Sequence, residues 1–434
     1  MRIGLSWRLV VSLCLMATAL PVNAVLRIEI TQGLSRAQPI AIVPFGVEGN
    51  VPLAVADVIA SDLTRSGRFK VLPVEDMLEQ PTAGKDIQFK NWRIFGVENV
   101  VVGKVIQTES GFLVQFQLYD VFRGQQLLGL SLPVGSSRLR RVAHEVSDLR
   151  YEELTGIPGA FSTRIAYITA DGTGEQRRYA LFVADSDGAN QHRIVRSPQP
   201  IMSPVWSPDG RQLAYVSFEN QRAEVFIQDL FTGERESVSS RAGINGAPAF
   251  SPDGKKLALT LSSEPGNPDI YVLDIESRRL QRLTRNPFID TEPSWHPDGD
   301  RLFFTSDRSG RPQIYEINVQ QRRAKRLTFE GRYNARPVVS PDGETLAMVH
   351  LDREGYNIAV LSLKTRALRI LTDGRLDESP SFAPNGTMII YATESDGRGI
   401  LSAVSVDGRV RQRLGVQEGD VREPAWSPRL SGSE

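Results

Sequence analysis

One seven-residue phrase recurs along the second half of the chain and constrains its fold more than any other feature. The leading prolines of successive copies are 44, 45, 44, 43 and 44 residues apart. The copies are Pro204–Gly210 (PVWSPDG), Pro248–Gly254 (PAFSPDG), Pro293–Gly299 (PSWHPDG), Pro337–Gly343 (PVVSPDG), Pro380–Gly386 (PSFAPNG) and the shortened Pro424–Pro428 (PAWSP). A period this regular predicts a stacked repeat architecture.

Each period holds four short apolar runs separated by turn residues. In the period that begins at Pro293, the phrase itself supplies the first run, followed by Arg301–Thr305, Ile314–Asn318 and a run ending at Leu327-Thr328. Aromatic and β-branched residues are frequent in these runs, which favours strands. Four strands in about 44 residues are typical of a propeller blade.

The two ends of the repeat region complete each other. Arg164–Thr169 is an apolar run without a preceding phrase, and Pro424–Pro428 is a phrase without a following run. We therefore expect an all-β, six-bladed β-propeller over residues 158–434, with four strands per blade. Its ring should close by pairing the innermost C-terminal strand with a strand from the N-terminal end, which leaves no unpaired sheet edge around the ring. We expect the recurrent aromatic residues at 206, 250, 295, 382 and 426 to pack between blades.

Residues 1–24 have the features of a cleaved secretory signal peptide. Arg2 and Arg8 precede an apolar run, and Val22-Asn23-Ala24 offers small residues for cleavage after Ala24. The alternative is a retained membrane anchor, but about twelve apolar residues are too few to span a bilayer. The only cysteine, Cys14, lies within this segment, and removing the two arginines changes the formal balance from 51 − 51 to 49 − 51. This near-neutral charge of −2 gives no support for binding nucleic acid or an anionic membrane.

Residues 37–157 are predicted to form a small α/β domain. We expect strands at Pro39–Phe45, Phe69–Leu72, Val97–Ile106, Gly111–Phe122 and Gln126–Pro133, and helices at Val51–Arg65, Asp86–Phe95 and Leu139–Leu154. The region has no GxGxxG, GxxxxGK or GxSxG motif between a strand and a helix. Gly156-Ile157-Pro158-Gly159 is the expected boundary with the propeller.

Residues 25–36 (VLRIEITQGLSR) permit two interpretations. Most chain termini are frayed or form one edge strand. Alternatively, the segment pairs with the sheet of a partner protein. The residues alone favour the first interpretation.

The segments that lead into each repeat proline are predicted to surround the mouth of the central channel. We name these the lead-in segments: 197–203, 239–247, 285–292, 329–336, 373–379 and 416–423. Polar and charged residues of both signs stand just before the prolines, namely Asn245, Thr291, Glu292, Asn334, Arg336, Asp377, Glu378, Arg422 and Glu423, and Ala247 stands directly before the proline of its own repeat. They form either a solvated rim or a receptor face for a protein loop, with Arg336, Glu292 and Glu378 giving charge complementarity.

No metal site is expected from the sequence. His144, His192, His296 and His350 fall in different elements without metal-ligand spacing. Asp185-Ser186-Asp187-Gly188 resembles the start of a calcium loop, but Arg196 stands where a calcium loop has its twelfth-position glutamate. We interpret this stretch as a turn.

These residues together resemble the TolB family, the periplasmic propeller proteins of the Tol-Pal cell-envelope system. The resemblance covers essentially the whole chain, and it is most specific at Ser197–Gly210, Asn245–Gly254, Thr291-Glu292-Pro293 and Ala383–Met388. It implies a monomeric periplasmic protein whose channel mouth binds the peptidoglycan-associated lipoprotein Pal, a face that bacteriocins also exploit. Within that face, the family positions fall on Ile244, Ala247 and Thr291, and Ile244 stands where some relatives have histidine.

The resemblance also implies that the mature N-terminal segment contacts the inner-membrane protein TolA, here through Val25, Leu26, Arg27, Ile28, Glu29 and Ile30. The expected function is therefore a non-enzymatic adaptor without a cofactor, supporting outer-membrane integrity and constriction during division. The alternative is a periplasmic hydrolase or lyase in which Glu292, Asp377 and Glu378 supply paired carboxylates. A third hypothesis is a calcium- or glycan-binding module.

Overall fold

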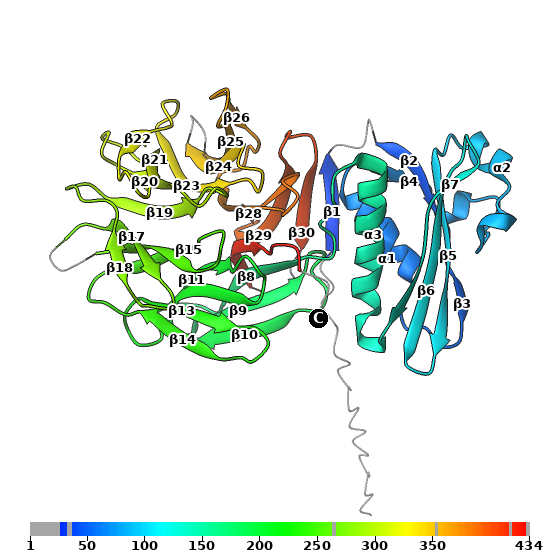
Figure 1. Ribbon diagram of the computed structural model, residues 1–434, viewed down its shortest axis with the longest axis horizontal. Helices are drawn as coiled ribbons and strands as arrows, with labels where there is room; N and C mark the ends of the chain where they lie inside the picture. The colour runs from blue at the N-terminus through cyan, green and yellow to red at the C-terminus, as the bar shows by residue number, and fades with distance from the viewer. Residues whose placement is uncertain (1–26, 33–36, 263–265, 352–354, 416–418, 431–434) are drawn as a thin grey trace, which may run out of the picture.

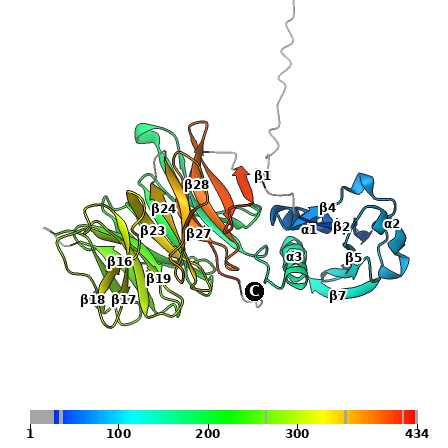
Figure 2. The same cartoon turned by 90° about the horizontal axis from the view of Figure 1, so that it is seen from above.

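The computed structural model describes residues 27–32, 37–262, 266–351, 355–415 and 419–430. Two parts lie side by side: an α/β part with three helices, and a ring of small sheets (Figures 1 and 2). The predicted combination of an α/β domain with a six-bladed propeller is confirmed. No helix in the described ranges is long and apolar enough to cross a membrane.

The α/β part is built on one sheet with the strand order β4-β2-β5-β6-β7, and β3 pairs with β5. Strands β4, β2 and β5 run parallel, whereas β5, β6 and β7 form an antiparallel meander. The strands are β2 Gln38–Ile42, β3 Gly46–Glu48, β4 Phe69–Val71, β5 Asn99–Thr108, β6 Gly111–Asp120 and β7 Gln125–Val134. The helices are α1 Val55–Arg65, α2 Phe89–Ile94 and α3 Leu139–Thr155, with short 3₁₀ turns at Val74–Asp76, Gly84–Asp86 and Ser136–Arg138.

Helices α1 and α3 pack together over the sheet because each has an apolar stripe. Val55, Val58, Ile59 and Leu63 recur at helical spacing on α1 and are buried in the same core as residues of α3. Helix α3 ends at Gly156, whose left-handed conformation (φ +70°) lets its N–H bond to Glu152 O at 2.8 Å. These two helices form the side of the α/β part that faces the propeller (Figure 2).

The predicted elements of the α/β part are present, and two of the three helices are shorter than predicted. The helix expected from Val51 begins at Val55, and the helix expected from Asp86 begins at Phe89. In the second case Gly84–Asp86 forms a 3₁₀ turn, and its end conformation at Ile87 is extended. The 3₁₀ turn that begins at Gly84 and the extended residue Ile87 therefore place the start of this helix after Asp86. The periodicity of the sequence alone does not predict this later start.

The propeller has six sheets arranged around a ring. Their strand orders, from the innermost strand outward, are β31-β8-β9-β10, β11-β12-β13-β14, β15-β16-β17-β18, β19-β20-β21-β22, β23-β24-β25-β26 and β27-β28-β29-β30. The strands are β8 Arg164–Asp171, β9 Arg178–Asp185, β10 His192–Ser197, β11 Ile201–Trp206, β12 Gln212–Ser217, β13 Glu224–Asp229, β14 Arg235–Ser239, β15 Asn245–Phe250, β16 Lys256–Leu261, β17 Asp269–Asp274, β18 Leu280–Arg282, β19 Asp290–Trp295, β20 Arg301–Ser306, β21 Gln313–Asn318, β22 Ala324–Arg326, β23 Tyr333–Val339, β24 Thr345–Leu351, β25 Tyr356–Ser362, β26 Leu368–Ile370, β27 Glu378–Phe382, β28 Met388–Ser395, β29 Arg398–Ser405, β30 Arg411–Gly415 and β31 Asp420–Trp426. A 3₁₀ turn at Gly174–Gln176 joins β8 to β9.

The ring closes as the repeat phase predicts. Strand β31 pairs antiparallel with β8, so the first blade combines the C-terminal phrase with the first apolar run. The last blade gains a fifth strand, because β1 (Arg27–Gln32) pairs antiparallel with β30. The pairs Ile28↔Leu414 and Ile30↔Gln412 fix its register.

The recurrent tryptophans connect neighbouring blades. Trp206 Nε1 donates to Ala425 O at 3.0 Å, Trp295 Nε1 to Ala249 O at 3.1 Å, and Trp426 Nε1 to Thr163 Oγ1 at 2.8 Å. Each of the first two indoles thereby reaches the innermost strand of the preceding blade. This arrangement confirms the predicted packing role and satisfies the polar end of a large buried side chain.

The α/β part contacts the propeller at the ends of the strands opposite to the lead-in segments. Arg65 Nη1 donates to Ser186 O at 3.0 Å, and Asn385 Nδ2 donates to Pro158 O at 3.0 Å. Ser186 lies in the β9–β10 turn and Asn385 in the β27–β28 turn, which stand at the far ends of their strands from the lead-in segments. The channel mouth and the junction are therefore on different faces of the propeller.

Candidate functional site

One residue in every blade, just inside the channel mouth, has a positive backbone φ angle. The residue before each repeat proline has a φ between +44° and +56°: Ser203, Ala247, Glu292, Arg336, Ser379 and Glu423. At the same place the register between the innermost strand and its neighbour shifts by a bulge. Non-glycine residues seldom adopt this conformation. Its recurrence in all six blades shows that the bulge is a regular part of the repeat and of the channel wall.

The residues at these bulges line the central channel. A cavity of about 200 Å³ is enclosed by three consecutive positions from each blade: the residue before the repeat proline, the proline itself, and the residue after it. Of the predicted site residues, Ala247, Glu292, Arg336 and Glu423 line this cavity. Proline within a strand is the sequence signal that predicts such bulges, because it cannot donate to the ladder.

Arg336 crosses the channel and joins its own blade to three others. Its Nη2 lies 2.8 Å from Glu423 Oε2, its Nε lies 3.5 Å from Glu292 Oε1, and its Nη1 donates to Ser379 Oγ. The backbone N–H groups complete the network, since Arg336 N donates to Glu292 Oε2 at 2.9 Å and Ser203 N to Glu423 Oε2 at 3.1 Å. Burial alone would lower the pKa of Arg336, but Glu423 and Glu292 outweigh it and raise that pKa. The two channel carboxylates are therefore held as ion-pair partners of one arginine.

Three of the predicted residues, and a fourth residue at the equivalent position, serve the shape of the lead-in segments instead of facing the cavity. The position three residues before the repeat proline is buried in each of four blades, at Asn245, Asp290, Asn334 and Asp377. Asn245 Oδ1 accepts from Ser239 Oγ at 2.6 Å, Asn334 Oδ1 contacts His350 Nδ1 at 2.8 Å, and Asp377 Oδ1 accepts from Thr393 Oγ1 at 2.6 Å. Asp290, which sequence reasoning did not single out, pairs with Arg308 at 2.7 Å.

The remaining predicted residues differ in exposure. Ile244 and Arg422 are exposed, whereas Thr291 and Glu378 are half-buried. Thr291 Oγ1 lies 3.3 Å from Thr260 Oγ1, which in turn accepts from Glu292 N at 3.2 Å. Thr291 thus borders the channel network from outside. Glu292 lines the cavity while Asp377 is buried within its own segment, so these two carboxylates do not share one pocket.

Apolar side chains at the mouth are, apart from Ile244, a feature that sequence reasoning missed. Several large hydrophobic residues of the lead-in segments are exposed, from 41% for Met202 to 72% for Phe329. The set, named here the apolar rim, is Met202, Ile244, Phe288, Ile289, Phe329 and Leu376. An available signal was the presence of one or two large apolar residues in five of the six lead-in segments, within otherwise polar sequence. An exposed apolar group with polar neighbours is typical of a protein-binding surface.

The N-terminal segment is placed by its backbone. Arg27, Ile28, Glu29 and Ile30 belong to β1 and pair with Gly415, Leu414, Arg413 and Gln412 of β30. Val25 and Leu26 lie outside the described residues. In Figure 1, β1 stands between the propeller and the helices of the α/β part.

A second polar cluster occupies the junction between the two parts. His144 on α3 is buried, and its Nδ1 lies 2.7 Å from Asp62 Oδ2 on α1. Its Nε2 lies 3.4 Å from Asp187 Oδ2, in the β9–β10 turn of the propeller. Burial alone would lower the pKa of His144, but Asp62 and Asp187 together raise it to about 9. Asp187 also pairs with Arg140, and its pKa is held below the usual range, because these cations outweigh the effect of burial.

Comparisons with known proteins agree with this architecture. The family described as "TolB amino-terminal domain" matches residues 26–127, and that described as "TolB beta propeller domain" matches residues 151–430. A Tol-Pal system protein TolB from Nitrosococcus oceani is 55% identical over 94% of this chain and 94% of its own length. A protein of the same name from Thioalkalivibrio sulfidiphilus is 54% identical over 98% of this chain and 99% of its own.

A solved structure also matches both parts together. The crystal structure of TolB from Acinetobacter baumannii has a TM-score of 0.87 and 45% identity, and the match covers 93% of this chain and 100% of that one. The repeat period, the closed six-bladed ring and these similarities lead to one conclusion: the chain belongs to the TolB family.

Proposed function

We propose that this protein is a non-enzymatic adaptor of the Tol-Pal system, and that its channel mouth binds the peptidoglycan-associated lipoprotein Pal. The observation that carries the proposal is the apolar rim around a channel whose charges are already paired. Exposed apolar side chains next to polar groups suit a protein partner, since hot spots in interfaces combine buried apolar anchors with a polar surround. Proteins named as Tol-Pal system proteins at 54–55% identity support the system.

The dimensions of the channel favour a protein loop over a small substrate. The cavity of about 200 Å³ is smaller than the roughly 300–1,000 Å³ typical of small-molecule sites. A loop from Pal would place one or two side chains into the channel and cover the apolar rim with its flanks. Ile244, Ala247 and Thr291 lie at or near the edge of the cavity and are the contacts we assign first.

The acidic residues give little support to catalysis. A general acid and base must face the same reacting group. Glu292 and Glu423 are ion-paired to Arg336, and Asp377 is buried with Thr393. The ion-paired residues therefore form a fixed channel lining instead of an acid–base pair. We assign Glu292, Glu378, Arg336, Arg422 and Glu423 to charge complementarity with Pal, for which this lining offers a fixed pattern of charges.

The N-terminal segment is proposed to carry the second interaction, with TolA. Strand β1 is held on the edge of the last blade by one ladder of backbone hydrogen bonds. It can therefore exchange between a docked state and a free state without disturbing the four strands inside it. If Pal binding changes that equilibrium, a coupling of ~1–3 kcal/mol would alter TolA affinity ~5–150-fold.

The cellular setting follows from these partners. After cleavage behind Ala24 the mature protein, residues 25–434, would work as a monomer in the periplasm. It would support outer-membrane integrity and constriction during division, and bacteriocins would use the same channel face during import.

Calorimetric titration of residues 25–434 with the soluble domain of Pal tests the proposal. Thr291→Arg should abolish the binding heat, because a long cation at the cavity edge blocks the loop. Thr284→Arg is unsuitable as a control because Thr284 is buried, so the matched control is the exposed Thr232→Arg in the β13–β14 turn on the other face. Deletion of residues 25–36 should change the affinity without abolishing binding. Absence of saturable binding by the unaltered protein would refute the proposal.

A further inference from the structure

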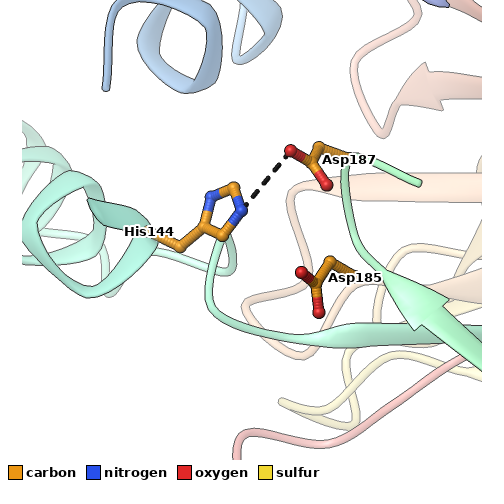
Figure 3. A group of neighbouring side chains, drawn as sticks. All are labelled: His144, Asp185 and Asp187. Carbon is orange, nitrogen blue, oxygen red and sulfur yellow. Dashed lines mark ion pairs between the residues drawn. The ribbon is translucent and has the colours of Figure 1, made fainter. Parts of the chain in front are cut away.

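Three potential metal ligands converge where α3 meets the first blade, on the face away from the channel mouth. His144 projects from α3, and Asp185 and Asp187 stand at the end of β9 and in the turn that follows (Figure 3). One ligand atom from each residue lies within 4.8 Å of the other two. The resemblance of Asp185–Gly188 to a calcium loop pointed to the two aspartates, but not to His144, which lies 41 positions earlier in the sequence.

The two nitrogens of the imidazole differ in how closely they are bound, with a hydrogen bond at Nδ1 and only a longer ion pair at Nε2. Nδ1 contacts Asp62 Oδ2 at 2.7 Å, whereas Nε2 is buried and has no hydrogen-bond partner among the residues that the structure describes. His144 as a whole is only 1% exposed, and Nε2 points toward Asp187 in Figure 3. Nε2 and Asp187 Oδ2 form an ion pair at 3.4 Å, which is longer than an ordinary hydrogen bond, so this end of the buried ring has room for a closer ligand.

We propose that His144, Asp185 and Asp187 form a binding site for a divalent transition metal, with Zn²⁺ as the best match. Nitrogen and carboxylate oxygen ligands suit this ion, which binds both at about 2.0–2.2 Å. Two ligands of one tetrahedral zinc are then about 3.3 Å apart. Nε2 of His144 and Oδ2 of Asp187 are separated by 3.4 Å, so this pair already has the spacing that a shared ion requires.

The surroundings of His144 match those of a metal-binding histidine. Such a histidine usually donates its second N–H to a carboxylate, which fixes the ring and the tautomer. Asp62 fills this role, and it is held in turn by Arg65, whose Nη2 lies 3.0 Å from Asp62 Oδ1. Arg65 also donates to Ser186 O at 3.0 Å, between the two aspartates. One network thus orients the ligands from both parts of the protein.

The charge of Asp187 can be balanced by Arg140 when no ion is bound and by the metal ion when it is bound. In the structure, Arg140 pairs with Asp187 from the solvent side, and its side chain is 28% exposed. A divalent cation would take the position of that guanidinium against Asp187, Arg140 would turn to solvent, and the proton on Nε2 of His144 would pass to water as the metal–nitrogen bond forms. Asp185 accepts from Asn190 Nδ2 through Oδ2 at 2.7 Å, which leaves its Oδ1 for the ion. Water would complete the coordination, since the protein supplies three ligands.

Titration of the chelator-treated mature protein with Zn²⁺ by calorimetry, and with Co²⁺ by visible absorption, tests this proposal. We expect one ion per chain and the absorption of tetrahedral Co²⁺. Asp187→Asn and His144→Gln should weaken binding at least tenfold, and Asp62→Asn should weaken it ~10–100-fold, as loss of a supporting carboxylate does elsewhere. Arg140→Gln should strengthen binding, because the competing cation is removed.

His192→Gln is the matched control, since His192 is an exposed histidine of the same blade. The His192→Gln variant should bind Zn²⁺ with the same affinity as the unaltered protein. Circular dichroism of each variant checks folding, and if His144→Gln fails to fold, the opposite effects of Arg140→Gln and Asp187→Asn decide. The proposal is overturned if the unaltered protein binds no stoichiometric ion, if His192→Gln removes the binding, or if Arg140→Gln does not strengthen it.

Discussion

Replacing Arg336 by methionine should destabilise the propeller, because this one side chain holds its own blade and three others together across the channel. The change keeps much of the aliphatic length but removes the guanidinium. Glu423 and Glu292 then lose their ion-pair partner while both still line the channel. The perturbation is therefore electrostatic, with little change in packing.

The magnitude follows from the contacts. A hydrogen bond to a charged group contributes roughly 1.5–3 kcal/mol, and breaking a fully buried charge pair costs roughly 3–5 kcal/mol. Exposed pairs contribute about 0–1 kcal/mol. The side chain of Arg336 is 26% exposed and that of Glu423 is 15% exposed, so this pair lies between the two cases. We expect the free energy of unfolding to fall by about 2–3 kcal/mol.

Urea unfolding followed by tryptophan fluorescence measures the loss, since Trp206, Trp295 and Trp426 all lie in the propeller. A double-mutant cycle with Glu423→Gln isolates the pair. The double variant should be less destabilised than the sum of the single variants, with a coupling of about 1–2 kcal/mol, within the range for contacting residues. Arg323→Met, at an exposed position, should leave the midpoint unchanged. A coupling below about 0.5 kcal/mol would refute the ion pair and the reasoning built on it.

Three further predictions concern other parts of the molecule. Arg150 is fully buried over the ring of Phe116, its three side-chain nitrogens have no hydrogen-bond partner in the described ranges, and burial lowers its pKa to about 9. Arg150→Met should therefore raise the free energy of unfolding of the α/β part by ~1–4 kcal/mol in urea melts, and a decrease would contradict this. Phe329→Ser should weaken Pal binding about tenfold in calorimetry without changing the melting temperature, while the exposed Phe231→Ser on the other face should do neither. With chelator present, the folded pKa of His144 lies above its unfolded value near 6.5, so its stabilising contribution is complete below that pH and is lost as pH rises through about 9. Melting temperatures should show this decline, and Asp62→Asn should flatten it.

Regular repetition is what made the fold predictable. Six copies of one phrase at a constant period specify the blades, and the unmatched run at Arg164–Thr169 specifies how the ring closes. The tryptophans Trp206 and Trp295 likewise have one physical use, which is to bridge to the preceding blade. These features are local in sequence and occur several times. A wrong prediction at one position therefore does not change the prediction of the whole fold.

Features that depend on contacts between distant residues were not predictable. No local pattern shows that Arg336 reaches Glu423, 87 residues away, or that His144 meets Asp62, 82 residues away. Exposure misled as well: Asn245, Asn334 and Asp377 are polar residues next to the mouth, but each is buried to hold its lead-in segment. Conversely, the apolar rim consists of residue types that sequence reasoning assigns to a core.

Photo-crosslinking at two ends of one blade tests the central proposal most directly. A photoreactive amino acid is placed at Ile244, on the channel mouth, or at Lys255, in the turn at the opposite end of the same blade. Both positions lie outside the strands, so neither variant should disturb the fold. The account predicts a cross-link to Pal in intact cells from position 244 and none from position 255. A cross-link from position 255 and none from position 244 would contradict it.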